Sequence, residues 1–143
     1  MKPRLSLLLA ALWWGSLTSL GFLVVPLLFT HMSGPAAAGA IAAKLFTGQT
    51  WLSVGCTMLL LMALNQKESS ATSLQAQTAI KFIVAGLFLA VLVEFGVAAR
   101  IVNARAEGGN LKLWHGIGSA MYLLQWVCAG MALWRLSGDT RTP

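Results

Sequence analysis

The feature that most constrains this chain is a set of four apolar runs, each long enough to cross a lipid bilayer as a helix. They cover residues 5–30, 47–65, 80–102 and 113–136. A helix rises about 1.5 Å per residue, so about 20 residues cross a hydrocarbon core about 30 Å thick. We therefore predict an all-α membrane protein, an up-down bundle of four transmembrane helices whose two termini lie on the same side.

Composition supports a single integral membrane domain over residues 1–143. Hydrophobic residues make up 57% of the chain and charged residues only 10%, whereas a soluble domain is about half apolar and about a quarter charged. An interior of this size cannot cover so much apolar surface, so the lipid bilayer is the expected partner. The net charge of +6 is spread over loops and helix ends, without the dense basic face that nucleic acid requires. No nucleic-acid partner is expected.

The connections carry further predictions. Residues 36–46 are rich in alanine, follow Gly34-Pro35 and hold one charge, Lys44. They predict a short extra helix before the second span, which either lies at the membrane surface or continues into that span. Thr47-Gly48 is the expected bend between the two. Residues 65–78 predict a solvated loop, and Pro26 predicts a bend near the end of the first span.

The distribution of Lys and Arg predicts the orientation. The side with both termini and the second loop carries Lys2, Arg4, Lys67, Lys81, Arg135 and Arg141. The other side carries Lys44, Arg100, Arg105 and Lys112. Because cytoplasmic loops carry the excess of Lys and Arg, both termini are expected in the cytoplasm. The first run is too long for the apolar region of a signal peptide and is expected to remain as a span.

The polar side chains of the spans converge on the half of the membrane that faces the first and third loops. Gly86, Ala90, Glu94 and Ala98 are spaced by four and form one stripe of the third helix. Small residues let helices approach closely in lipid, so Glu94 is expected to face a neighbouring helix. A charge at membrane depth costs about 3 kcal/mol even on the lenient insertion scale, which makes function the default hypothesis for Glu94.

A polar pocket or a packed polar seam is therefore expected in this half. Its candidate ligand-binding residues are Glu94, His115, Tyr122, Gln49, Ser53, Ser119, Arg100, Arg105, Lys44 and His31. We expect the Glu94 carboxyl to be uncharged or held by hydrogen bonds from Tyr122, Gln49, His115 or Arg100. A structural role in locking the bundle is the alternative for Glu94, and interfacial anchoring is the alternative for the arginines.

Catalytic and metal chemistry have little support in the sequence. No nucleophile–base–orienter set is present, so no catalytic residue is assigned and an enzyme is not favoured. His31 and His115 share a membrane level but have no carboxylate or thiolate beside them, so neither a metal nor a cofactor is predicted. Cys56 and Cys128 lie inside apolar runs without CxxC spacing and are expected to act as small hydrophobic side chains.

Three stretches resemble a known family. They are LWWGSLTSLGFLVVPLLFTHM, AAKLFTGQTWLSVGC and VNARAEGGNLKLWHGIGSAMYLLQ. They resemble the bacterial family called domain of unknown function 4149 and are similar to eukaryotic transmembrane protein 205. The shared elements are KLF at 44–46, NAR at 103–105 and His-Gly at 115–116. The resemblance implies a four-helix protein of the bacterial inner membrane and no established activity; the third loop is much shorter here than in the eukaryotic type.

Three functional hypotheses follow. The first is a non-enzymatic bundle that binds or passes a small ligand through the polar half. The second is an accessory subunit of a larger membrane complex, or a homo-oligomer, built on small-residue helix faces. The third is a haem- or metal-binding membrane protein, because a Trp-x-Gly in the first span and the end Leu28-Phe29-Thr30-His31 also resemble copper-resistance-D and HemJ-type proteins.

Overall fold

The computed structural model describes residues 3–65 and 74–138, and these are helical almost throughout. In chain order the elements are α1 (Pro3–Ser19), the π-helical turn η1 (Leu20–Val24), α2 (Val25–His31), α3 (Pro35–Asn65), α4 (Leu74–Leu92), the π-helical turn η2 (Val93–Ala98), α5 (Ala99–Glu107) and α6 (Leu111–Gly138). Four continuous helices are long and apolar enough to span a membrane. The predicted fold class, an all-α integral membrane protein, is confirmed.

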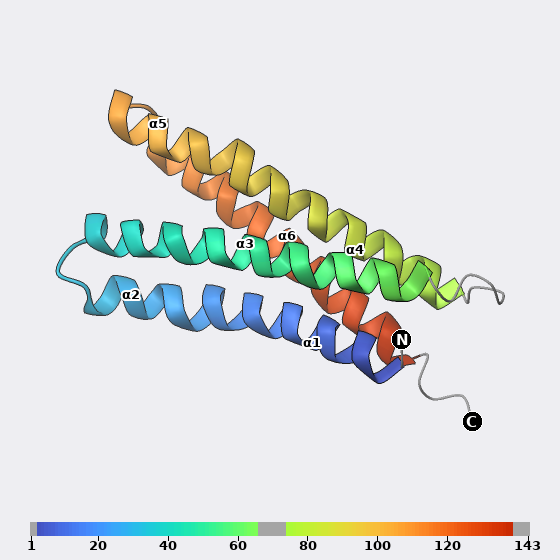
Figure 1. Ribbon diagram of the computed structural model, residues 1–143. Coiled ribbons are helices and arrows are strands. Elements are labelled where there is room, and N and C mark those ends of the chain that lie inside the picture. Colours follow the sequence, from blue (N-terminus) through green and yellow to red (C-terminus); the bar gives the residue numbers. More distant parts are fainter. Residues whose placement is uncertain (1–2, 66–73, 139–143) are drawn as a thin grey trace.

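The four spans form two antiparallel hairpins. The first hairpin joins α1–η1–α2 to α3, and the second joins α4–η2–α5 to α6 (Figure 1). α1 contacts α3 and α6, and α4 also contacts α3 and α6, so the spans close a ring of four. The start of α1 and the end of α6 lie at the same end of the bundle (Figure 1), as an up-down arrangement requires.

The second span is longer than expected and is one unbroken helix. The segment predicted as a short extra helix is helical and continues without a break into the span, so α3 runs over 31 residues. The predicted bend at Thr47-Gly48 is wrong, because both residues have helical hydrogen bonding and Gly48 does not adopt positive φ. The alanine-rich run and the absence of proline after Pro35 let the helix propagate.

The third span also extends beyond its predicted ends. α4 begins at Leu74, and the helix continues through α5 to Glu107; residues 66–73 of the predicted second loop lie outside the described residues. Gly108 has φ 73° and ends α5 in the left-handed conformation. Asn110 then accepts a hydrogen bond from the Leu113 amide at 3.0 Å through its side-chain oxygen and caps α6. The third loop is therefore only three residues long.

The apolar core lies in the half of the bundle near the start of α1 and the end of α6. Its buried members are Ala10, Trp13, Leu17, Cys56, Leu60, Leu64, Ala79, Ile83, Ala129, Ala132 and Leu136. The depth of Trp13 and Trp14 has a packing reason. The Trp13 ring is fully buried against Gly86, and the Trp14 ring stacks on Trp126 with centroids 5.8 Å apart and lies beside Gly130.

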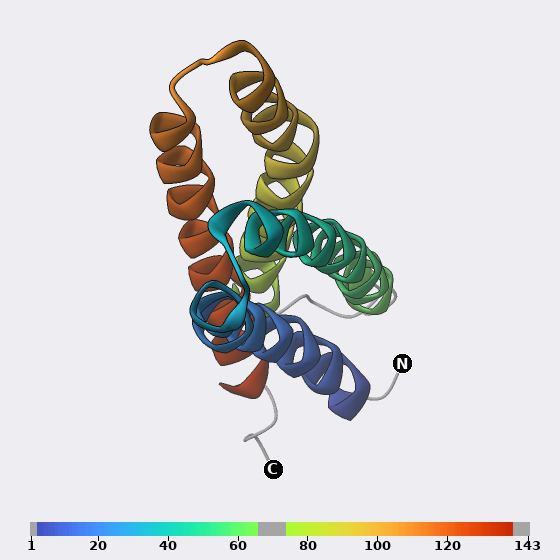
Figure 2. The ribbon, with the colours of Figure 1, turned by 90° about the vertical axis from the view of Figure 1, so that its left-hand side faces the viewer.

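The two hairpins diverge toward the other end of the bundle (Figure 1). Figure 2 views the molecule from this end and shows the α2–α3 and α5–α6 connections well apart. The buried apolar residues of this half are small: Ala38, Ala42, Val97 and Ala104. We call this region, which comprises α2, η2, α5 and the facing halves of α3 and α6, the divergent half.

Candidate functional site

Glu94 is joined to α3 through Thr47. The Thr47 hydroxyl donates to Oε1 of Glu94 at 2.8 Å. Glu94 lies in the middle third of the span Ala76–Glu107, on a helix face where Ala90 and Val97 are buried. Its carboxyl group therefore points toward the neighbouring helix at the inner end of the divergent half.

The partner of Glu94 differs from those predicted. Tyr122, Gln49, His115 and Arg100 were expected, and Thr47 is the hydrogen-bond partner found among the described residues. The physical reason is the unbroken α3. On a continuous helix Thr47 faces η2. Gln49 follows two residues later, a rotation of about 200° around the helix axis, so its side chain points to the opposite side.

The helix that carries Glu94 is wider than an α-helix at this point. Glu94 is the second residue of η2, a π-helical turn of six residues between α4 and α5. Such turns within α-helices are uncommon, and they occur frequently at functional sites. The π-helical turn and the cost of a charge at membrane depth thus both draw attention to the segment that holds Glu94.

Four polar side chains form a hydrogen-bonded cluster, which we call the polar seam: Ser16, Gln49, Ser53 and Gln125. Gln49 donates from Nε2 to Ser16 Oγ at 2.9 Å, and Gln125 donates from Nε2 to Ser53 Oγ at 3.1 Å. Ser53 also donates to the Gln49 carbonyl at 2.8 Å. The exposed fraction is 0% for Ser53 and 4% for Gln125. The polar seam therefore ties α1, α3 and α6 together; Ser53 and Gln125 are buried, and Ser16 and Gln49 are half-buried.

Tyr122 lies between the divergent half and the core. Its hydroxyl donates to the Leu17 carbonyl at 2.7 Å, and its ring lies against Gly21. In an α-helix the Gly21 amide would bond to the Leu17 carbonyl, so the Tyr122 hydroxyl occupies an acceptor of the α1 backbone. The π-helical turn η1 begins at Leu20, next to this contact. The Tyr122 ring also meets Phe46 edge-to-face, with centroids 5.3 Å apart.

The other predicted residues lie nearer the loops and are exposed: Arg100, Arg105, Lys44, His31, His115 and Ser119. The Arg100 guanidinium lies 5.6 Å from the centroid of the Trp114 ring, a cation–π contact. The Arg105 guanidinium extends across to α3, where a Cβ on Gly39 would lie 3.4 Å from it. The basic members of this set, Lys44, Arg100 and Arg105, are exposed toward the loop end of the divergent half.

The two histidines do not meet. His31 ends α2, and its Nδ1 lies 2.8 Å from the Thr30 hydroxyl and 3.1 Å from the Leu27 carbonyl. His115 is on α6, and these two elements make no contact within residues 3–65 and 74–138. The same part of the chain holds no group of three His, Cys, Asp or Glu side chains able to bind a metal ion.

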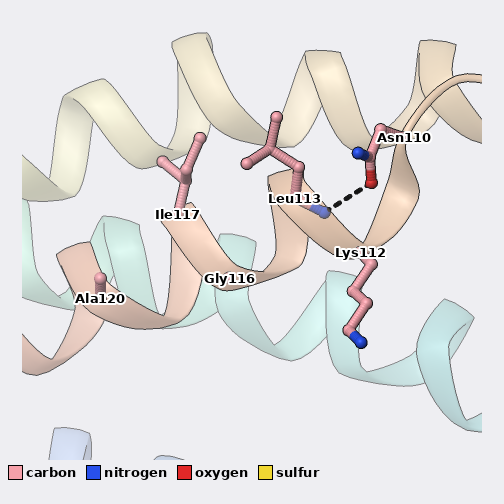
Figure 3. Close-up of a pocket in the computed structure, with 6 residues that line it drawn as sticks. All are labelled: Asn110, Lys112, Leu113, Gly116, Ile117 and Ala120. Atoms are coloured by element: carbon pink, nitrogen blue, oxygen red, sulfur yellow. Dashed lines mark hydrogen bonds between the residues drawn. The ribbon is translucent and has the colours of Figure 1, made fainter.

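A shallow depression of about 480 Å³ lies on the surface of α6. Its lining residues are Asn110, Lys112, Leu113, Gly116, Ile117 and Ala120. In Figure 3 Leu113 and Ile117 point to one side of the helix and Lys112 to the other. The Asn110 side-chain oxygen is already used by the Leu113 amide (Figure 3). None of the ten predicted residues lines this depression, and its polar groups do not converge.

Sequence reasoning missed three members of these clusters as site residues: Thr47, Ser16 and Gln125. Gln125 carried a signal, because it is a glutamine inside an apolar span and lies one turn from Tyr122. Ser16 and Thr47 carried none, because single hydroxyl side chains are common in membrane helices and often bond to their own backbone.

The family described as "Domain of unknown function (DUF4149)" matches residues 8–110, well over half of the chain. The protein belongs to the DUF4149 family. Searches of curated proteins and of solved structures found no match.

The DUF4149 match covers only part of the candidate site. It runs from α1 to the end of the third loop and so includes both Thr47 and Glu94. α6, which supplies Tyr122 and Gln125, follows it. In this DUF4149 protein the Glu94–Thr47 pair thus lies inside the matched region, and the closure of the polar seam depends on a helix beyond it.

Proposed function

We propose that this protein is a non-enzymatic membrane bundle that binds a small amphipathic ligand between its two hairpins, in the divergent half. The observation that carries this proposal is the uneven packing along the bundle. The buried apolar cluster belongs to the other half, whereas the hairpins separate toward the first and third loops (Figure 2). Ligand sites in helical bundles lie between facing helices, which is the position described here.

Binding is favoured over passage through the bundle. A molecule crossing the membrane would have to pass the polar seam and the core beyond it. Ser16, Gln49, Ser53 and Gln125 bond to one another, and breaking such a set leaves buried polar groups unpaired in a medium without water. The contact between the Phe46 and Tyr122 rings is a further obstacle to a molecule crossing the bundle.

We further propose a bacterial inner-membrane location with both termini in the cytoplasm. The support is the Lys and Arg count of six on the side of the termini against four on the other. The similarity to transmembrane protein 205 is proposed on the shared order of the KLF, NAR and His-Gly elements.

Photolabelling tests the proposed function without assuming a ligand charge. The probe is a neutral alkyl glucoside with a diazirine in its chain, added to the protein in nanodiscs and crosslinked by light. Labels mapped by peptide mass spectrometry should concentrate on residues 36–47 and 94–105, and an excess of unlabelled glucoside should suppress them. Labelling spread evenly over lipid-facing residues, without competition, would contradict the proposal.

Two glycine substitutions on α3 provide the matched comparison. Gly39→Leu fills the space beside Arg105, because a Cβ at Gly39 already meets that side chain at 3.4 Å. Gly55→Leu is the control, since a Cβ there meets nothing within 4 Å. The competed labelling should fall several-fold in Gly39→Leu and stay unchanged in Gly55→Leu. An equal effect of the two substitutions would argue for non-specific lipid contact.

A further inference from the structure

We propose that the ligand is an organic cation, whose positive charge lies against the Glu94 carboxylate and the Thr47 hydroxyl with its apolar groups against the adjoining aromatic rings. This inference rests on the proposed function and names the chemical class of the ligand. It starts from a carboxyl group at membrane depth whose described partner is one neutral hydroxyl. A carboxylate at membrane depth requires a counter-charge or a dense set of donors, and the hydrogen bond found for Glu94 among the described residues comes from one neutral hydroxyl.

The side chains of Arg100 and Arg105 point to other partners. Arg100 lies over the Trp114 ring, and Arg105 extends to Gly39 on α3. Glu94 and Arg105 are eleven residues apart on one continuous helix, which is about 16 Å along its axis. Glu94 therefore lies at the inner end of the divergent half, and Arg100 and Arg105 lie nearer its loops.

Aromatic rings lie at the same depth as Glu94. A Cβ on Gly118 would contact Val97 Cγ1 at 3.4 Å, which sets η2 against α6 at this level. Glu94 is about one turn further in from Val97, and Tyr122 is about one turn further in from Gly118. Tyr122 is in contact with Phe46, the residue before Thr47. Ring faces attract organic cations such as quaternary ammonium groups, so rings and carboxylate together fit an ammonium- or phosphonium-like group.

Two other classes of ligand fit this arrangement less well. An anionic lipid in its normal orientation would place its head group beside Arg100 and Arg105. Its apolar chain would then lie against Glu94, which is unfavourable for the carboxylate. A bare inorganic cation such as Na⁺ or Ca²⁺ needs several oxygen ligands, and the Glu94–Thr47 contact supplies oxygen atoms from only two side chains. An organic cation needs one counter-charge and neighbouring aromatic rings, and Glu94 and the Phe46–Tyr122 pair lie at the same depth.

Two ions of the same shape and opposite charge provide the test: tetraphenylphosphonium and tetraphenylborate. Saturable binding is measured by equilibrium dialysis against protein in nanodiscs of neutral lipid, with empty nanodiscs subtracted. The wild-type protein should bind the phosphonium at least tenfold more tightly than the borate. Glu94→Gln keeps an acceptor for Thr47 and should weaken phosphonium binding at least tenfold. Glu107→Gln removes the same charge at the exposed end of α5 and should leave binding unchanged.

Equal or tighter binding of the borate would overturn the inference, as would phosphonium binding that Glu94→Gln leaves intact. The comparison of the two ions on the wild-type protein decides the matter even when Glu94→Gln fails to fold. The outcomes also separate the two proposals. Competed photolabelling without phosphonium selectivity rejects the cation and leaves the proposed function standing, whereas the absence of both rejects the proposed function itself.

Discussion

The ring of Tyr122 on α6 occupies the space that a side chain on Gly21 would need. A Cβ at Gly21 would lie 2.7 Å from Cε1 of the tyrosine, and the tyrosine hydroxyl reaches past it to the Leu17 carbonyl. The missing side chain at Gly21, the hydroxyl bound to the Leu17 carbonyl and the π-helical turn η1 therefore lie at one place in the bundle. This contact joins the first and last spans where the core meets the divergent half.

Gly21→Ala should destabilise the bundle. The added methyl group forces the Tyr122 ring to move, and overpacking of this kind costs about 1–3 kcal/mol. Thermal unfolding in detergent, followed by circular dichroism, should show a lower midpoint for this variant. The matched control is Gly15→Ala, where a Cβ meets nothing within 4 Å and the helix gains up to about 1 kcal/mol in propensity. Equal midpoints for the two variants would show that the close contact is not maintained.

The Glu94–Thr47 hydrogen bond should appear as a coupling energy. Glu94→Leu strands the Thr47 hydroxyl, and Thr47→Val removes the donor, so each should lower the unfolding midpoint. The double variant should lose less than the sum by about 0.6–1.7 kcal/mol, the range for such bonds in membranes. Glu94→Gln should stay close to wild type because its side chain still accepts the bond. Strictly additive losses, or a Glu94→Leu variant as stable as wild type, would place Glu94 against lipid head groups or water.

Gln125→Leu should loosen the polar seam. The substitution removes the 3.1 Å donation to Ser53 and should cost about 0.5–1.5 kcal/mol, the net value of a typical intramolecular hydrogen bond. Gln77→Leu, an exposed glutamine on α4, is the control and should change the unfolding midpoint little. A stabilised Gln125→Leu variant would mean that the buried polar cluster serves function at the expense of packing.

Topology can be measured by cysteine labelling in intact cells. In a background with both native cysteines replaced by alanine, single cysteines are placed at Asn65, Gly109 and Gly138. A membrane-impermeant maleimide added outside should label only the cysteine at Gly109, because α3 and α6 end on the opposite side from the third loop. Labelling at Asn65 together with Gly109 is incompatible with an up-down bundle, and labelling at Asn65 and Gly138 alone would reverse the proposed orientation.

Much of the fold follows from the sequence because each span is apolar along its whole length and the bilayer fixes the length a span needs. The four spans and the stripe that turns Glu94 toward a neighbouring helix were predictable for that reason. Helix boundaries were not, since helix propensity carried α3 through Thr47-Gly48 and α5 on to Glu107. The hydrogen-bond partner of Glu94 could not be predicted, because it depends on which side chains of α3 face η2. The expected bend at Thr47-Gly48 would have rotated those side chains differently. The two π-helical turns were not anticipated from the sequence, and η1 lies beside a contact with a tyrosine about one hundred residues away.

The most direct test of the central claim is a distance measurement between the ligand and Glu94. Solid-state NMR of ¹³C-glutamate-labelled protein with bound tetraphenylphosphonium reports the dipolar coupling between the ³¹P nucleus and each glutamate carboxyl carbon. The Glu94→Gln spectrum identifies the Glu94 signal by its loss. The organic-cation site at Glu94 predicts that the Glu94 signal is dephased by ³¹P and that the other glutamate signals are not. Saturable phosphonium binding with no dephasing at Glu94 would contradict the account.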